Sequence, residues 1–279
     1  MTWMAPGTVA EAVRLRAEWP EATLVAGGTF VGILTRQGLL ASEDWISLQN
    51  VAELRELSTG AELALGAMVT HRRVEQDPDV AAGWPGVRRV FAAVASPRVR
   101  NAATVGGMLG DADYASDPPA MLIALDAWVE VLSVRGLRRI PVAELIVGHY
   151  QTSLEEDELI TRVLVPRGRH LVVYRKLRTR SREDRPCVAV AASLHQGRVS
   201  VVVGAVAERP QRFPDLCATW DPADGASASE IAAGYADRID PIGDSRGSAA
   251  YRTRMIAVEV RRALDTLAPA ALTPQAAGT

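Results

Sequence analysis

Ala26-Gly27-Gly28-Thr29 and Thr104-Val105-Gly106-Gly107 are two glycine-rich segments, and each of them follows an apolar stretch. Paired glycines carry no Cβ atom that would hold an anion away from the backbone, and they allow positive φ, so that successive N–H groups can converge on a phosphate. The threonines add hydroxyl donors, and neither segment contains a lysine. We therefore expect two halves of one cradle for the diphosphate of a bound dinucleotide, rather than a site that hydrolyses a nucleotide triphosphate.

The residues around the first segment support this interpretation. A β run over 23–26 leads into the glycines, and a helical turn over 30–34 follows them. A strand, a bend and a helix start together present amide groups and a dipole to an anion. A glycine pair after a strand is equally typical of a tight turn without a ligand. Neither the G-x-G-x-x-G fingerprint nor the P-loop pattern is present.

Composition excludes several classes of protein. With 279 residues, of which 48% are hydrophobic, the chain can form two domains with buried cores. A net charge of −2 argues against a nucleic-acid-binding protein. No apolar run approaches the roughly 18–20 residues that a membrane span needs, and the first residues do not resemble a signal peptide, so we expect a cytoplasmic protein.

The cysteines and histidines predict no metal site. Cys187 and Cys217 have no second cysteine or histidine at ligand spacing, so this chain is not expected to carry an iron–sulfur cluster, and both are interpreted as small buried side chains. The four histidines are scattered along the chain. The sequence also offers no G-x-S-x-G elbow, no nucleophile beside a base and no pair of carboxylates for acid–base work. We therefore assign no catalytic side chain and expect a cofactor to supply the chemistry.

The pattern along the chain predicts an α+β fold in two domains. In the first domain, Thr8 and Glu11 form a capping box for a helix that stops at Pro20, and Ser96-Pro97 ends a helix over 85–94. Asp117 is the expected N-cap of a further helix, because two prolines follow it. The remaining expected elements of this domain are strands over 45–48, 62–65 and 159–165, a hairpin formed by 128–132 and 139–141, and a helix over 51–57.

The sequence pattern changes near residue 167, where we place the start of the second domain. Three β runs, 171–176, 188–194 and 198–203, predict a three-stranded antiparallel sheet whose last two strands are joined by His195-Gln196-Gly197. Two helices over 228–236 and 248–267 follow, and we expect a disordered tail over 269–279. Arg252, Arg254, Arg261 and Arg262 are interpreted as the solvated face of the last helix. The arginines between 175 and 185 are read as a solvated surface, with a docking surface for an acidic partner or a pyridine nucleotide as the alternative.

A longer comparison of motifs points to one family. The string from Arg100 to Pro119, together with Ala26-Gly27-Gly28-Thr29, resembles the FAD-binding medium subunit of the molybdenum hydroxylases, the family of xanthine dehydrogenase and aerobic carbon monoxide dehydrogenase. The likeness continues through 148–160, through Tyr174-Arg175-Lys176 and through 247–252. It implies a two-part FAD-binding domain of the PCMH or vanillyl-alcohol-oxidase type over 1–168 and a flavoprotein C-terminal domain of the carbon monoxide dehydrogenase type over 169–268.

The resemblance also implies site residues and partners. Asp117 would accept a hydrogen bond from ribityl or ribose hydroxyls, Ile160 would lie near the isoalloxazine ring, and Lys176 would stabilise negative charge on the reduced ring. Electrons would arrive from 2Fe–2S clusters in a small subunit, after hydroxylation at a molybdenum cofactor in a large subunit, and leave FAD for NAD, a quinone or oxygen. The residues that would wrap the FAD diphosphate or flank it are Leu24, Val25, Ala26, Gly27, Gly28, Thr29, Phe30, Thr104, Val105, Gly106, Gly107 and Met108.

Two positions depart from the family pattern. Many members have asparagine or another small polar residue where this chain has Met108, and proline is common where Tyr114 stands. Met108 removes one possible side-chain hydrogen bond to the cofactor, and the Tyr114 ring could either stack near the flavin or pack. A flavoprotein that works alone, as an oxidoreductase or an accessory protein, and a scaffold without flavin are the alternative functions.

Overall fold

The computed structural model describes residues 2–40, 42–168 and 171–272. Contacts divide the chain into two units, one formed by Met1–Asp113 with Asp126–Arg167 and the other by Tyr114–Leu125 with Gly168–Thr279. Both units mix helices and strands, as the sequence predicts. The segment Tyr114–Leu125 therefore packs with the C-terminal unit, although the residues on both sides of it belong to the first.

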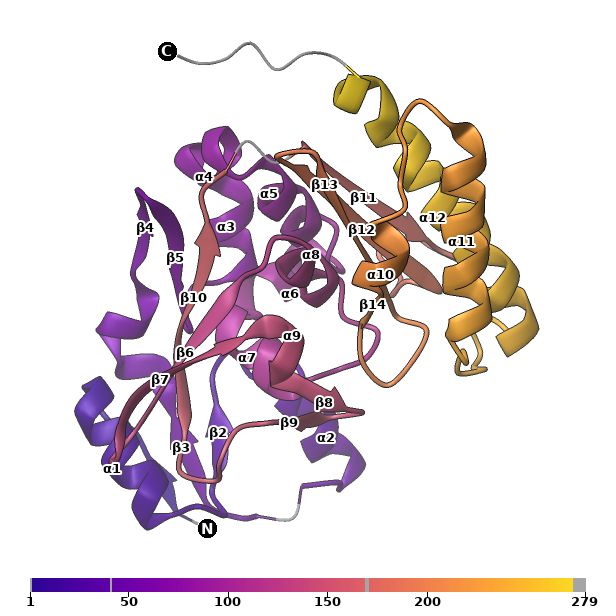
Figure 1. The fold of residues 1–279 in the computed structure, drawn as a ribbon. Helices are drawn as coiled ribbons and strands as arrows, with labels where there is room; N and C mark the ends of the chain where they lie inside the picture. The colour runs from indigo at the N-terminus through magenta and orange to yellow at the C-terminus, as the bar shows by residue number, and fades with distance from the viewer. Residues whose placement is uncertain (1, 41, 169–170, 273–279) are drawn as a thin grey trace. The chain divides into compact units, whose positions relative to one another are not determined.

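The first unit contains two larger sheets (Figure 1). A parallel sheet has the order β1-β3-β2, and an antiparallel sheet has the order β4-β5-β10-β6-β7. A separate small hairpin joins β8 to β9. The strands are β1 (Trp3–Met4), β2 (Thr23–Val25), β3 (Trp45–Ser47), β4 (Leu57–Thr59), β5 (Glu62–Gly66), β6 (Trp128–Ser133), β7 (Gly136–Pro141), β8 (Ile146–Gly148), β9 (Gln151–Thr152) and β10 (Leu159–Pro166).

The first helix, α1 (Val9–Glu18), confirms the capping prediction with one change. The Thr8 hydroxyl accepts a hydrogen bond from the Glu11 N–H at 3.2 Å. The Glu11 carboxylate accepts from the Gly7 N–H at 2.9 Å, one residue earlier than in a standard capping box. The helix contacts β3 of the parallel sheet and both β6 and β10 of the antiparallel sheet.

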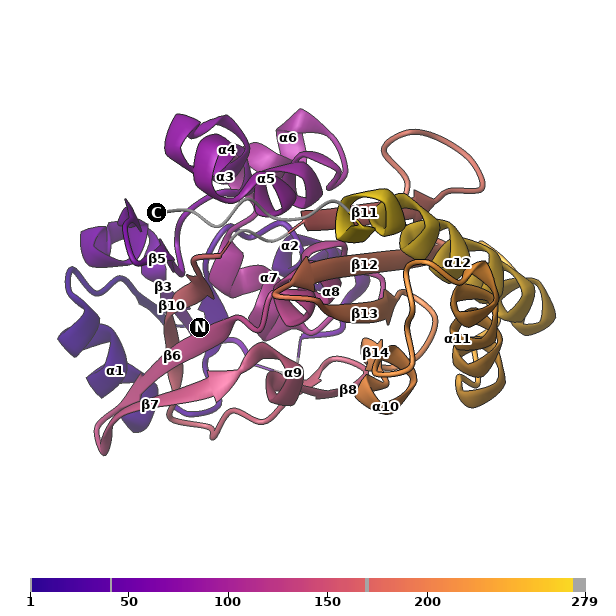
Figure 2. The same ribbon diagram turned by 45° about the horizontal axis from the view of Figure 1, so that its top comes forward.

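The other helices of this unit are short, and α3, α4, α5 and α6 pack on one another as a cluster (Figure 2). Ser96-Pro97 does follow the end of α5, but these residues also begin a new helix, because the Ser96 hydroxyl accepts from the Val99 N–H at 3.5 Å. The helices are α2 (Val31–Gln37), α3 (His71–Gln76), α4 (Pro78–Gly83), α5 (Pro85–Ala92), α6 (Pro97–Ala102), α7 (Val105–Asp111) and α9 (Val142–Leu145).

The helical piece expected over 51–57 is shorter than predicted and is a 3₁₀ helix, not an α-helix. The chain forms two 3₁₀ turns, Leu48–Asn50 and Ala52–Arg55, and then enters strand β4. The apolar residues Val51 and Leu54 are buried, 0% and 1% exposed, so the helix-like spacing of apolar residues reflects burial of a 3₁₀ segment.

The second unit is built on one antiparallel sheet with the order β11-β12-β13-β14. The sequence predicts three strands, and this number is wrong because the two-residue strand β14 (Gln211–Arg212) adds to β13. The hairpin prediction is confirmed: Gln196 and Gly197 connect the strands with φ of +48° and +76°, as a type I′ turn requires. The other strands are β11 (Leu171–Leu177), β12 (Val188–His195) and β13 (Arg198–Gly204).

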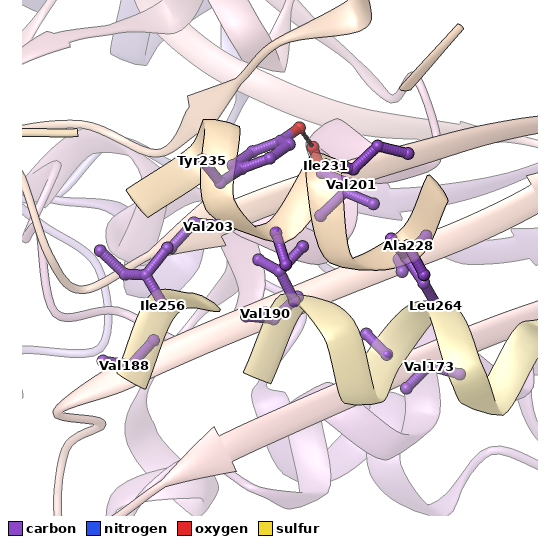
Figure 3. Packing of buried hydrophobic residues seen from close by; sticks show 14 of the residues in the cluster. Val173, Val188, Val190, Val201, Val203, Ala228, Ile231, Tyr235, Ile256 and Leu264 are labelled. Atoms are coloured by element: carbon purple, nitrogen blue, oxygen red, sulfur yellow. Dashed lines mark hydrogen bonds between the residues drawn. The ribbon is translucent and has the colours of Figure 1, made fainter. Parts of the chain in front are cut away.

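The two faces of this sheet have different neighbours. Alternate residues such as Val188, Val190 and Val201 pack against α11 (Gly225–Arg238) and α12 (Ala249–Leu272), as Figure 3 shows. On the same side, the Tyr235 hydroxyl donates to the carbonyl oxygen of Val201 at 2.6 Å. Helix α8 (Pro118–Ala124) contacts β12 and β13, and the Ser193 hydroxyl donates to the carbonyl oxygen of Ala124. A further short helix is α10 (Pro214–Cys217).

Two expectations about the C-terminal helix need correction. Helix α12 includes Pro269 and continues to Leu272, so the first residues of the expected tail are helical; residues 273–279 lie outside the described part of the chain. Arg252 is not solvated but 0% exposed, and it donates to the carbonyl oxygen of Ile242 and to Asp244. Arg254, Arg261 and Arg262 are exposed, as expected.

The cysteines behave as the sequence predicts, since Cys187 and Cys217 are free and buried. None of the helices in the described ranges combines the length and the apolar character that crossing a bilayer requires. Within the same ranges, no three His, Cys, Asp or Glu side chains are grouped in a way that could hold a metal ion.

Candidate functional site

The two glycine segments lie against each other within the first unit. A Cβ atom added at Gly27 would lie 1.9 Å from the carbonyl oxygen of Ala102. A Cβ atom added at Gly107 would lie 3.5 Å from the Cβ of Ala26. Segments that are about 75 residues apart in the sequence therefore meet, and only glycine at position 27 permits this distance.

The first segment presents unused backbone donors. Gly28 has a φ of +68°, so the chain bends sharply between β2 and α2. Among the described residues, no acceptor binds the backbone N–H groups of Gly27, Gly28, Thr29 and Phe30. Consecutive free N–H groups on a positive-φ bend form a concave anion site. The donor set and the absence of Cβ atoms fit a diphosphate.

The second segment differs from the expectation. It is not a turn with positive φ, because Thr104 caps the helix α7 and the two glycines lie in its first turn. The N–H groups of Val105 and Gly106 donate to the carbonyl oxygens of Val69 and Ala67, at 2.9 and 2.8 Å. The Gly107 N–H donates to the Thr104 hydroxyl at 3.2 Å. These donors are used within the protein, so this segment contributes mainly the shape of the cradle.

Gly106 has a packing role of its own. A Cβ atom at this position would lie 2.5 Å from the Cβ of Ala67. The Ala67 N–H donates to the carbonyl oxygen of Thr161, the residue after Ile160. Backbone hydrogen bonds thus connect α7 to β10 at the position of Ile160, which is 6% exposed.

The flanking side chains of the cradle are mostly apolar. Val25 and Met108 are each 8% exposed, so the Met108 thioether packs in the interior. The Phe30 ring stacks on Tyr150 with centroids 5.3 Å apart, and Tyr150 stacks on His149 at 4.3 Å. Tyr150 has a φ of +56°, which is uncommon for a residue with a side chain.

Asp117 belongs to the second unit and does not cap its helix. It occupies the N-cap position of α8 without a capping hydrogen bond. Its two carboxylate oxygens accept from the Tyr174 hydroxyl at 2.5 Å and from the Lys176 ammonium at 2.9 Å. The Asp117 and Lys176 side chains are only 5% and 3% exposed. Burial raises the pKa of Asp117 and lowers that of Lys176, while each charge opposes the shift of the other.

The sequence analysis did not predict the hydrogen bond from Tyr174 to Asp117. Tyr174 and Lys176 stand two residues apart in β11, so both side chains leave the same face of the strand. Arg175 lies between them and points to the other face, where it binds Glu259 of α12 at 2.6 Å. The sequence shows that Tyr174 and Lys176 are two residues apart in a strand. It does not show that Asp117 lies next to both side chains.

The Tyr114 side chain is fixed by a carboxylate of the same unit. Its hydroxyl donates to Asp244 at 2.6 Å, and Asp244 also accepts from Arg252 at 2.8 Å. Burial acts to raise the pKa of Asp244, but hydrogen bonds from Tyr114, from the Arg246 backbone and from Arg252 hold it below its usual range. Ala115, next in the chain, packs against Ala189 and Ala205.

The fold and the geometry define a class of protein. A close-packed backbone cradle with free N–H donors is typical of a domain that holds a dinucleotide cofactor. Two family models match the chain: the FAD binding domain in molybdopterin dehydrogenase over residues 1–168 and the CO dehydrogenase flavoprotein C-terminal domain over 173–267. The chain belongs to the family of FAD-binding medium subunits of the molybdenum hydroxylases, its cofactor is FAD, and it is an oxidoreductase subunit.

Individual relatives cover almost the whole chain. The nicotine 6-hydroxylase medium subunit of Paenarthrobacter nicotinovorans is 32% identical over 94% of this chain and 95% of its own length. The carbon monoxide dehydrogenase medium chain of Afipia carboxidovorans is 29% identical over 93% of this chain and 94% of its own length. Among solved structures, quinoline 2-oxidoreductase from Pseudomonas putida 86 contains a chain with a TM-score of 0.90, 30% identity and 98% coverage of both chains.

Proposed function

We propose that this chain is the electron-transfer subunit of a molybdenum-containing hydroxylase complex. It takes electrons from 2Fe–2S clusters of a small subunit onto FAD and passes them to NAD, a quinone or oxygen. A large subunit with the molybdenum cofactor acts on the substrate. The names of the relatives support separate partner subunits, since they are described as medium chains or subunits of dehydrogenase or hydroxylase complexes. We also assign the two-sheet first unit to the PCMH or vanillyl-alcohol-oxidase type.

The meeting of the two glycine segments carries this proposal. Free N–H groups of Gly27, Gly28, Thr29 and Phe30 would bind the oxygens of the FAD diphosphate. The residues proposed to enclose or flank the diphosphate are the twelve named from the sequence, in the segments 24–30 and 104–108. When bound, FAD supplies the redox chemistry, because it accepts electrons singly or in pairs.

Asp117, Lys176 and Ile160 stay proposed cofactor contacts. Each carboxylate oxygen of Asp117 has one hydrogen bond in this structure and retains a lone pair for a ribityl or ribose hydroxyl. The buried ammonium of Lys176 is suited to stabilise negative charge on a reduced ring. The side chain of Ile160 is apolar, so it would contact the isoalloxazine ring by van der Waals packing alone.

Purification of the chain tests the proposal directly. The recombinant protein should show the absorbance bands of flavin, and the apoprotein should take up one FAD in a fluorescence titration. Copurification from the native host should give a complex that contains iron and molybdenum. A yellow protein that copurifies with no partner would instead favour the stand-alone flavoprotein, and a colourless protein that does not bind FAD would exclude both functions.

A further inference from the structure

His71 has a buried ring without a hydrogen bond. The residue begins α3 and is 2% exposed. Both ring nitrogens are enclosed by protein, and neither has a hydrogen-bond partner among the described residues. The ring lies edge-on to Phe91 of α5, with centroids 4.9 Å apart. A buried polar group without a partner costs free energy that an apolar side chain of similar size would not cost at this position.

The backbone of His71 holds the segment that shapes the cradle. The His71 N–H donates to the carbonyl oxygen of Ala103 at 2.9 Å. An antiparallel bridge joins the preceding residue to Thr104. Ala103 lies between Ala102, against which Gly27 packs, and Thr104, which caps α7. The start of α3 therefore supports the three residues that bring the two glycine segments together.

The Thr104 carbonyl oxygen lies close enough to act on the His71 ring. Burial lowers the pKa of His71 to about 4, and the backbone of Thr104 acts in the opposite direction, as only an acceptor does. The ring is therefore neutral near neutral pH and carries one N–H donor. Thr104 is 3% exposed, and its carbonyl oxygen accepts from the Met108 N–H at 3.0 Å. A carbonyl oxygen has a second lone pair, so it can also accept the imidazole N–H.

Arg100 of α6 is the charged side chain that acts on the ring. Its guanidinium donates to Glu75 of α3 at 2.9 Å and to the carbonyl oxygens of Val94 and Ala95 at 2.7 and 2.9 Å. Within the part of the chain that the structure describes, none of its hydrogen bonds ends on Thr104. The imidazole is therefore the side-chain donor that is placed to bind the Thr104 carbonyl oxygen.

We propose that His71 is a positioning residue for the FAD site: its ring N–H binds the Thr104 carbonyl oxygen and keeps residues 102–104 where Gly27 packs against them. This inference rests on the proposed place of the FAD diphosphate between the two glycine segments. The bond needs only a small adjustment of the ring, because the backbone of the same residue already binds Ala103. The Thr104 hydroxyl, which accepts from the Gly107 N–H, is held with it. FAD affinity then depends on a buried side chain that supports the cradle from behind.

The test compares His71→Leu with His71→Asn and His71→Gln. Leucine fills the space of the ring without a donor, whereas the amide N–H groups of asparagine and glutamine stand in for the Nδ1 and Nε2 donors. FAD is removed from each purified chain and titrated back, with flavin fluorescence as the signal. We expect the FAD dissociation constant of His71→Leu to rise about fivefold, as for the loss of one neutral hydrogen bond. One of the two amide variants should recover most of the affinity.

Phe91→Leu is the control for lost packing, because it removes the ring beside His71 and leaves the imidazole donor in place. It should lower the thermal unfolding temperature of the apoprotein and change FAD affinity less than about twofold. If Phe91→Leu weakens FAD binding as much as His71→Leu does, or if neither amide variant recovers affinity, packing is the cause and the inference is wrong. Unchanged FAD affinity in His71→Leu also overturns it.

Gly27→Ala separates a failure of this inference from a failure of the proposed site. If Gly27→Ala weakens FAD binding and His71→Leu does not, the cradle stands and only the role of His71 is wrong. If Gly27→Ala leaves FAD affinity unchanged, the proposed place of the diphosphate is wrong, and the role of His71 falls with it. A wild-type chain that does not bind FAD would contradict the proposed function as a whole.

Discussion

Gly27 packs so closely against Ala102 that no side chain fits between them: an added Cβ would lie 1.9 Å from the Ala102 carbonyl oxygen and 2.7 Å from its carbonyl carbon. This contact holds the loop after β2 beside the end of α6, two residues before the N-cap of α7. The same loop carries the free N–H donors. The shape of the cradle and its packing thus depend on one missing Cβ atom.

Gly27→Ala should therefore lower both stability and FAD binding. Because the backbone of Ala102 must move, we expect the free energy of unfolding to fall by about 3 kcal/mol, at the upper end of overpacking effects. Gly32→Ala is the matched control, since a Cβ there meets nothing within 4 Å and the residue lies in α2. The control should raise stability by about 0.5–1 kcal/mol and keep FAD affinity. Urea unfolding measures the stability and FAD titration measures the affinity. If the two variants have equal stability and equal FAD affinity, the close contact at Gly27 does not shape the FAD site.

Lys176→Met should leave Asp117 buried without its counter-charge. We expect a loss of about 3 kcal/mol in the free energy of unfolding near neutral pH. Because burial already raises the pKa of Asp117, its protonation should reduce this loss as the pH is lowered toward 4. The double variant Asp117→Asn with Lys176→Met removes both charges and should recover most of the loss. A double variant no more stable than Lys176→Met would show that the ion pair is not the cause.

Tyr114→Phe and Asp244→Asn separate the contribution of the Tyr114 hydrogen bond from that of the Arg252 ion pair, because Asp244 takes part in both. Tyr114→Phe removes one hydrogen bond and should cost about 1 kcal/mol, since Asp244 keeps Arg252. Asp244→Asn leaves the fully buried Arg252 without a carboxylate and should cost about 3 kcal/mol. Chemical unfolding of both variants at neutral pH gives the comparison. Equal losses would mean that the Tyr114 hydroxyl, and not the Arg252 charge, dominates.

His71 should make the protein sensitive to acid. Burial lowers the pKa of its imidazole to about 4, from an ordinary value of 6.5, and the nearby Arg100 charge adds to this shift. The native state keeps the ring neutral, while the unfolded chain takes up a proton below pH 6.5. The stabilisation is therefore complete above pH 6.5 and is lost as the pH falls toward 4, by up to about 3 kcal/mol.

The matched variant for this prediction is His71→Leu, which keeps an apolar side chain beside Phe91. Its free energy of unfolding should depend less on pH between 7 and 4 than that of the wild-type protein. Parallel pH curves for the two proteins would show that other groups cause the acid sensitivity.

Local patterns predicted much of the fold. The Thr8 cap, the hairpin at Gln196-Gly197 and the alternating strands of the second unit were predictable, because each depends on residues close in sequence. The 3₁₀ segment after Val51 and the added strand β14 were not. Short elements of this kind form when their neighbours bury them, and their own residues have no strong preference.

The same division holds for the site and for the whole protein. The sequence by itself determined the two glycine segments, the family resemblance and the set of charged residues in 174–185. Only the tertiary structure decided that Gly27 meets Ala102, that the amides of α7 are already bonded, and that Asp117 binds Tyr174 and Lys176 and caps no helix. The sequence determines which donors, acceptors and charges are available. Which of them pair is decided only when distant segments pack together, because a buried polar group that is left unpaired costs free energy.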